Sequence, residues 1–84
     1  MGTRSRPKPK HLADKLRRIR RSLGLSQNEL IERLGVEEWI VRSTISAFER
    51  GTREPSYLVL LRYAKIAGVS TDVLIDDALQ LDLN

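Results

Sequence analysis

The 84-residue chain has no cysteine, a single histidine and no long hydrophobic run. Without cysteine it cannot form a disulfide, a thiolate nucleophile or a cysteine-based metal site, so its fold must come from packing alone. The longest uncharged apolar runs, such as YLVLL at residues 57–61, are far shorter than the roughly 20 residues that a membrane span requires. The N-terminus also lacks the apolar core of a signal peptide. These absences predict a soluble cytoplasmic protein with no membrane partner.

Patterns typical of catalysis are also missing. The single histidine, His11, lies beside the basic N-terminus with no nucleophile or carboxylate pair dedicated to it. Asp76 and Asp77 are neighbours on an expected helix, where consecutive side chains point in different directions. General acid–base chemistry needs positioned partners, and a metal needs a cluster of ligands. The sequence therefore predicts a protein that is not an enzyme and uses no metal and no cofactor.

Positive charge is concentrated in the front part of the chain. Residues 1–53 contain 13 basic and 6 acidic side chains, whereas residues 54–84 contain 2 and 5, so the two parts carry +7 and −3. This asymmetry favours an anionic partner that approaches from one side, with nucleic acid ahead of an acidic membrane surface. A chain this short buries only roughly 60% of its unfolded surface, so we expect one small domain.

Residues 1–11 differ in composition from the rest of the chain. They contain two prolines, one glycine and no acidic or periodic apolar residues. The segment contains four basic residues: Arg4, Arg6, Lys8 and Lys10. Such a segment cannot pack, and we interpret it as a flexible basic arm. It either follows DNA phosphates or enters a minor groove, as other terminal arms do, or it is a solvated leader without a partner.

Apolar periodicity and capping signals predict two helices in the first part of the domain. The first, at about residues 12–23, carries one apolar stripe: Leu12, Leu16, Ile19 and Leu23. The second, at about residues 27–34, starts with a capping box made by Ser26 and Glu29 and stops at Gly35.

Three further helices are expected after residue 41. The third, at about residues 42–50, has an inward stripe of Val41, Ile45 and Phe48. Its outward face is made of small or hydrogen-bonding residues with one arginine, which suits a helix pressed into a groove. The fourth is expected at about residues 57–67 and the fifth at about residues 72–79, while residues 80–84 are expected to fray. The folded domain is thus predicted at residues 12–79.

Five short motifs occur in a fixed order along these helices. They are LSQNELIERLG, RSTISAFERG, REPS, LLRYAKIAGVS and DVLIDD. Together they resemble the helix-turn-helix domain of the Cro and lambda-repressor-like (XRE) family of bacterial and phage regulators, over residues 12–77. The resemblance implies an all-α fold: a five-helix lambda-repressor-like domain behind the flexible basic arm. In such domains the second helix crosses the DNA backbone and the third lies in the major groove.

The resemblance also implies DNA-binding roles for individual residues. Those placed to reach base edges lie on the third helix: Arg42, Ser43, Thr44, Ser46 and Ala47. Arg42 suits a bidentate contact with guanine, whereas Ala47 offers only apolar contact to a thymine methyl group. Those placed to bind the DNA backbone lie at the start of the second helix and around the end of the third: Gln27, Asn28, Arg50, Thr52 and Arg53. Arg20 and Glu49 match an ion pair that joins the first helix to the third, a structural role.

The chain departs from this family between the second and third helices, where it has four additional residues. Val41 also occupies the place of the usual Ser or Thr cap. Either residues 38–41 are helical and lengthen the third helix by about 6 Å, or they form a turn that leaves this helix at its ordinary length. We favour the turn because Gly35 breaks the second helix and no capping residue precedes residue 38. Trp39 in this turn either covers the core or anchors a protein partner.

On the fourth helix, periodicity turns Tyr57, Leu60, Leu61 and Ala64 inward. The last two helices then offer more apolar surface than a small monomer should expose. The residues assigned to this surface are Leu58, Val59, Tyr63, Ile66, Leu74, Ile75 and Leu79. The simplest use of such a surface is a homodimer that binds two half-sites about 34 Å apart. We therefore expect a sequence-specific double-stranded DNA-binding transcriptional regulator, a repressor, in the cytoplasm of a bacterium or phage-infected cell. The alternative is a protein-docking or antitoxin-like module that uses Trp39 and the last two helices.

Overall fold

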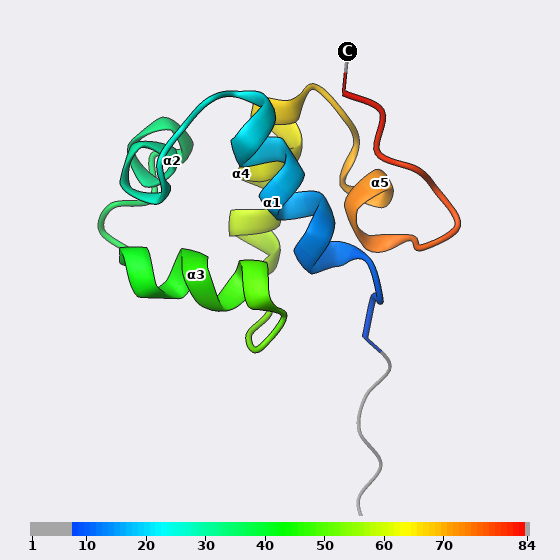
Figure 1. Cartoon of the computed structure of the whole chain (residues 1–84), viewed down its shortest axis with the longest axis horizontal. Coiled ribbons are helices and arrows are strands. Elements are labelled where there is room, and N and C mark those ends of the chain that lie inside the picture. Colours follow the sequence, from blue (N-terminus) through cyan, green and yellow to red (C-terminus); the bar gives the residue numbers. More distant parts are fainter. Residues whose placement is uncertain (1–7, 84) are drawn as a thin grey trace, which may run out of the picture.

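The computed structural model describes residues 8–83, and all regular structure in this part of the chain is helical. The helices are α1 (Leu12–Ser22), α2 (Gln27–Leu34), α3 (Arg42–Arg50), α4 (Tyr57–Ala67) and α5 (Thr71–Ile75). Figure 1 shows α3 along one edge of the molecule, with α1 and α4 beside it in the centre. The all-α, five-helix fold expected for a lambda-repressor-like domain is confirmed. Residues 1–7 of the expected arm lie outside the described residues.

One hydrophobic core joins the helices. It consists of residues from every helix, from the turn between α2 and α3 and from the segment after α5: Leu12, Leu16, Ile19, Leu30, Ile31, Leu34, Val36, Ile45, Phe48, Val59, Leu60, Tyr63, Ala64, Leu74 and Leu81. The stripe predicted for the first helix packs inward except for Leu23, which is 37% exposed because α1 ends at Ser22. None of the described helices has the length and apolar character needed to cross a membrane.

The start and end of α2 follow from local capping. The Ser26 hydroxyl accepts a hydrogen bond from the Glu29 N–H at 3.0 Å, and the Glu29 carboxylate accepts one from the Ser26 N–H at 2.8 Å. Together these bonds satisfy N–H groups that a helix start leaves without partners. Gly35 ends the helix with a φ of 69°, in the left-handed region that glycine adopts most easily. The predicted capping box is confirmed.

The additional residues between α2 and α3 form a turn and do not lengthen α3. The N–H groups of Trp39 and Ile40 both donate to the Val36 carbonyl, at 2.9 and 3.1 Å, and α3 begins only at Arg42. Val41 is extended, 63% exposed and makes no side-chain cap. The favoured turn is therefore correct, but the prediction that Val41 packs inward is wrong. Its place on the inner face of α3 is taken by Thr44 and Glu49.

The inner face of α4 differs from the face expected for it. Tyr57 and Leu61, which periodicity placed inward, are 80% and 40% exposed. Val59 and Tyr63, which were assigned to the outer surface, are 2% and 0% exposed. The segment YLVLL is apolar on all sides of the helix, so its periodicity does not select one face. Packing against α1 and α2 makes that selection.

The last helix is shorter than predicted, and the segment after it is ordered. α5 ends at Ile75, not at residue 79. The ammonium group of Lys15 donates to three carbonyl oxygens at this end, those of Val73 at 2.7 Å, Leu79 at 2.9 Å and Asp76 at 3.1 Å. Leu81 is only 4% exposed. The prediction that residues 80–84 fray is therefore wrong for Leu81, because this side chain completes the core.

Tyr63 carries a buried hydroxyl group with no hydrogen-bond partner among the described residues. Burial raises the pKa of this phenol well above its ordinary value. Because an unsatisfied buried hydroxyl destabilises the fold, we expect Tyr63→Phe to raise the free energy of unfolding by about 1 kcal/mol. Urea denaturation followed by circular dichroism measures the change, with the exposed Tyr57→Phe as the control. A loss of stability would instead mean that the Tyr63 hydroxyl is hydrogen-bonded in solution.

Candidate nucleic-acid interface

The outer face of α3 is continuous and has no acidic side chain. Arg42, Ser43 and Arg50 are exposed, and Ser46 and Ala47 between them are half-buried. Glu49, the one carboxylate of this helix, is turned inward and is 9% exposed. Four of the five residues predicted to reach base edges therefore lie on one accessible ridge.

Thr44 is the exception among the predicted base-reading residues. It is 8% exposed and lies on the same inner face of α3 as Ile45 and Phe48. Its assignment to the base-reading set is wrong, because the inner face of α3 is rotated toward Thr44 and away from Val41. Residues 44, 45, 48 and 49 form the inner face of α3, so residues 42, 43, 46, 47 and 50 form the outer ridge.

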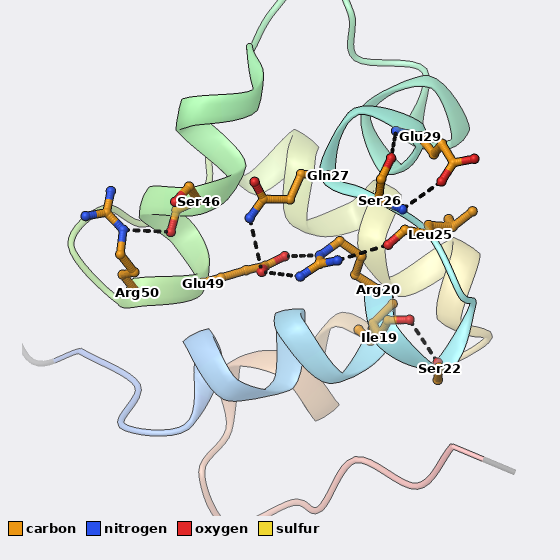
Figure 2. Close-up of polar contacts among 10 residues, drawn as sticks. All are labelled: Ile19, Arg20, Ser22, Leu25, Ser26, Gln27, Glu29, Ser46, Glu49 and Arg50. Carbon is orange, nitrogen blue, oxygen red and sulfur yellow. Dashed lines mark hydrogen bonds and ion pairs between the residues drawn. The ribbon is translucent and has the colours of Figure 1, made fainter.

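The Arg20–Glu49 pair expected between α1 and α3 is present. Figure 2 shows the guanidinium group of Arg20 lying between the Glu49 carboxylate and the Leu25 carbonyl. The Arg20 Nε and Nη2 groups donate to the two carboxylate oxygens of Glu49 at 2.7 and 2.9 Å, and Nη1 donates to the Leu25 oxygen at 2.9 Å. The hydrogen bond to Glu49 raises the pKa of Arg20, so this group stays charged. The pair ties α1, α3 and the turn before α2 together.

Gln27 extends this network to the start of α2. Its side-chain amide donates to a Glu49 oxygen at 3.4 Å, as the close-up in Figure 2 also shows. Gln27 is half-buried and the next residue, Asn28, is exposed. The first turn of α2 is therefore held at a set distance from α3. This is the spacing on which a helix-turn-helix depends, since one helix must cross the backbone while the other enters the groove.

The predicted backbone-binding residues at the end of α3 and in the turn after it lie on the surface. Arg50, Thr52 and Arg53 are all exposed. The Thr52 hydroxyl donates to the Ala47 carbonyl at 3.3 Å, and the Arg50 Nε donates to the Ser46 carbonyl at 3.3 Å. The Thr52 bond holds the turn against the end of α3, which places Arg53 close to the base-reading ridge.

The apolar surface assigned to the last two helices is only partly correct. Leu58, Ile75 and Leu79 are 46%, 46% and 41% exposed, and Ile66 is half-buried. Val59, Tyr63 and Leu74 belong to the core, so placing them on a partner surface was wrong. Pattern-based reasoning missed Tyr57 and Leu61, which are exposed next to Leu58 along α4.

Trp39 is not buried over the core. It is 51% exposed, and the guanidinium carbon of Arg62 lies 5.4 Å from the centre of its ring, within the range of a cation–π contact. Arg62 also donates to the Leu34 carbonyl at 2.9 Å, so it links the turn to the end of α2. A shallow hollow beside Trp39 is lined in part by Ile40, Phe48 and Leu58.

Comparison with curated proteins finds two relatives described as uncharacterized HTH-type transcriptional regulators. One, from Methanothermobacter thermautotrophicus, is 43% identical over 53 residues, which are 63% of this chain and 71% of the relative. The other, YqaE from Bacillus subtilis, is 33% identical over 63 residues, which are 75% of this chain. The aligned part spans about half, 51%, of the Bacillus protein.

A solved structure and a family match agree with these relatives. The crystal structure of the P22 c2 repressor in complex with a synthetic operator superposes with a TM-score of 0.67 and 27% identity, covering 79% of this chain and 94% of the repressor chain. The model of the helix-turn-helix family HTH_3 matches residues 16–74. The chain therefore belongs to the helix-turn-helix family HTH_3, and the lambda-repressor-like (XRE) domain expected from its motifs is confirmed.

Proposed function

We propose that this protein is a sequence-specific DNA-binding transcriptional regulator that places the outer face of α3 in the major groove. The observation that carries the proposal is the acid-free ridge of Arg42, Ser43, Ser46, Ala47 and Arg50, which lies on an accessible edge and is followed by Arg53. Both curated relatives are described as transcriptional regulators, and the crystal structure of the P22 c2 repressor contains a synthetic operator. Under this proposal the protein binds DNA in the cytoplasm and is not an enzyme.

In this proposal the ridge on α3 contacts the bases, and residues near the two ends of the ridge contact the DNA backbone. Arg42 at the start of α3 donates to the N7 and O6 acceptors of guanine, while Ser43 and Ser46 offer hydroxyl groups that suit several bases. Gln27 and Asn28 hold a phosphate at the first turn of α2, where free N–H groups and the helix dipole favour an anion. Arg50, Thr52 and Arg53 hold the backbone on the other side, which sets the angle at which α3 enters the groove.

The turn before α3 adds negative charge at one end of this surface. Glu37 and Glu38 are exposed there, immediately before the base-reading ridge. Carboxylates repel phosphates but accept hydrogen bonds from the exocyclic amine of cytosine. We infer that this turn lies over the groove at a base and not along a phosphate strand, since only the first position avoids repulsion.

We further propose that the protein acts as a homodimer and represses transcription by occupying its operator. The exposed side chains of Leu58, Ile75 and Leu79 support a self-association surface. A dimer would bind two half-sites about 34 Å apart and gain both affinity and specificity. A protein partner is the second candidate, supported by the half-exposed Trp39 beside Leu58.

Selection from a randomised duplex pool, followed by sequencing at low and near-physiological salt, tests the proposed function. Enrichment of one palindromic sequence that survives the higher salt would support base reading by a dimer. Enrichment of a single half-site would support base reading by a monomer. Binding that enriches no sequence and disappears at the higher salt would contradict the regulator and favour the protein-docking function.

Two arginine substitutions separate base reading from backbone binding. We expect Arg42→Ala to cost about 1–3 kcal/mol on the selected duplex and to relax the preference at one base pair, because a bidentate base contact is lost. Arg53→Ala should weaken specific and random duplexes alike and reduce the salt slope by about 1. Fluorescence anisotropy across a salt series measures both effects. Equal losses on specific and random duplexes for both variants would contradict this division of roles.

A further inference from the structure

The start of α1 is held by a residue from the far end of the chain. The carboxylate of Asp77 accepts hydrogen bonds from the backbone N–H groups of Lys10 at 2.8 Å and His11 at 3.1 Å. These N–H bonds, chiefly the one from Lys10, lower the pKa of Asp77, so it is ionised at neutral pH. His11, at the cap position itself, makes no side-chain cap. Asp77 therefore fixes the two residues that lead into α1 through their backbone N–H groups.

The segment that carries Asp77 is itself fixed to α1. Lys15 donates to the carbonyl oxygens of Val73, Asp76 and Leu79, on both sides of Asp77. The contact is thus reciprocal: a lysine of α1 holds the segment after α5, and an aspartate of that segment holds the residues before α1. Figure 1 shows this segment beside the point where the chain enters α1. The direction in which residues 8–10 leave the domain is therefore set by the end of α5.

Residues 8–10 lead to the turn after α3. Lys8, Lys10 and Arg53 line one hollow together with Gly51, the residue that ends α3. The only acidic residue in its lining is Glu54, so three basic residues and one acidic residue surround the hollow. All three cations are exposed, and the hollow adjoins the turn that follows the base-reading ridge. A duplex lying against α3 would bring its phosphates past this point.

We propose that Lys8, Lys10 and Arg53 form a phosphate-binding site for the duplex backbone, and that Asp77 is the positioning residue that holds the two lysines in it. The proposal rests on the proposed DNA-binding function and extends it to a residue that does not touch DNA. Asp77 acts through the backbone of Lys10 and His11, which orients the lysine side chains toward Arg53. The acidic end of the chain thereby contributes to binding of a polyanion.

The direction in which Asp77→Ala changes the affinity for DNA distinguishes a positioning role from a simple effect of charge. Asp77→Ala raises the net charge by one, and charge alone predicts tighter binding to DNA. Loss of positioning predicts the opposite result, because two lysines leave the phosphate site. Asp82→Ala is the matched control, since Asp82 is exposed in the same terminal segment and the substitution makes the same change of charge.

The experiment measures binding of the full chain to the selected duplex across a salt series, well below the melting temperature of each variant. We expect Asp77→Ala to bind on the order of tenfold more weakly and with a salt slope reduced by about 1 to 2, while Asp82→Ala binds as tightly as the parent or tighter. Asp77→Asn, which keeps one carbonyl acceptor for the Lys10 N–H, should recover part of the affinity. It also replaces Asp77→Ala if the alanine variant does not fold.

A further variant assigns the loss to the lysines. In a Lys8→Ala/Lys10→Ala background, Asp77→Ala should reduce the salt slope no further. If Asp77→Ala binds like Asp82→Ala, or binds more weakly with an unchanged salt slope, the positioning role is overturned. In both cases the parent still binds the duplex and the proposed function stands. If the parent itself fails to bind any duplex, the proposed function fails and the positioning role fails with it.

Discussion

Glu49→Ala is expected to lower the free energy of unfolding by about 3 to 5 kcal/mol, because it leaves the largely buried guanidinium group of Arg20 without its counter-charge. The side chains of Arg20 and Glu49 are 17% and 5% exposed, and two hydrogen bonds join them. The substitution also removes the acceptor of the Gln27 amide, so α1, α2 and α3 lose their common polar contact. An 84-residue domain has roughly 4–12 kcal/mol of stability in total, so this loss is a large part of it.

Urea denaturation of the variant measures this loss, with Glu32→Ala on the exposed side of α2 as the control, expected to stay within about 0.5 kcal/mol of the parent. A double variant, Arg20→Met with Glu49→Leu, should recover most of the lost stability, because apolar residues of similar size carry no desolvation cost. Loss of less than about 1 kcal/mol on Glu49→Ala would contradict the interpretation of the pair as a buried structural contact.

Lys15→Met should have the second-largest effect, a loss of about 3 kcal/mol in the free energy of unfolding. Methionine keeps the length and apolar stem of the side chain, but it cannot donate to the carbonyl oxygens of Val73, Asp76 and Leu79. Lys15 is 4% exposed, so water replaces these three bonds only where the local packing opens. The loss should be concentrated in the segment after α5.

Hydrogen exchange of backbone amides locates this effect. Protection in Lys15→Met should fall around residues 73–81 and stay close to that of the parent in α2 and α3. Arg21→Met, an exposed position on the same helix, provides a control that removes the same charge. If both variants lose the same stability, the effect belongs to the charge of α1 and not to the three hydrogen bonds.

The sequence alone allowed accurate prediction where a short-range signal exists. The bounds of α2, α3 and α4 agree with prediction because each is followed by a glycine in the left-handed region, and α2 and α4 begin at serine caps. The turn before α3 was also favoured correctly, from the break at Gly35 and the absence of a capping residue. The Arg20–Glu49 pair came from the family resemblance, since nothing in the sequence pattern joins residues so far apart.

Prediction failed where several side chains compete for one interior. Apolar residues occur on every side of α4, so only contact with the neighbouring helices decided that Tyr63 points inward and Tyr57 outward. At α3, Val41 was expected to point inward and is exposed, whereas Thr44 was expected to point outward and is buried. The hydrogen bonds of Lys15, and those that Asp77 accepts from Lys10 and His11, join positions more than fifty residues apart, so no local pattern predicts them.

The sequence by itself determined the order of the helices, the serine caps of α2 and α4 and the family, because capping hydrogen bonds and apolar periodicity act within one or two turns of the chain. Only the tertiary structure decided which residues of α3 and α4 remain on the surface. It also decided that Lys15 is structural, that Leu81 belongs to the core and that Asp77 holds the start of α1. The physical reason is that burial and long-range hydrogen bonding depend on which segments meet in space, and folding alone brings those segments together.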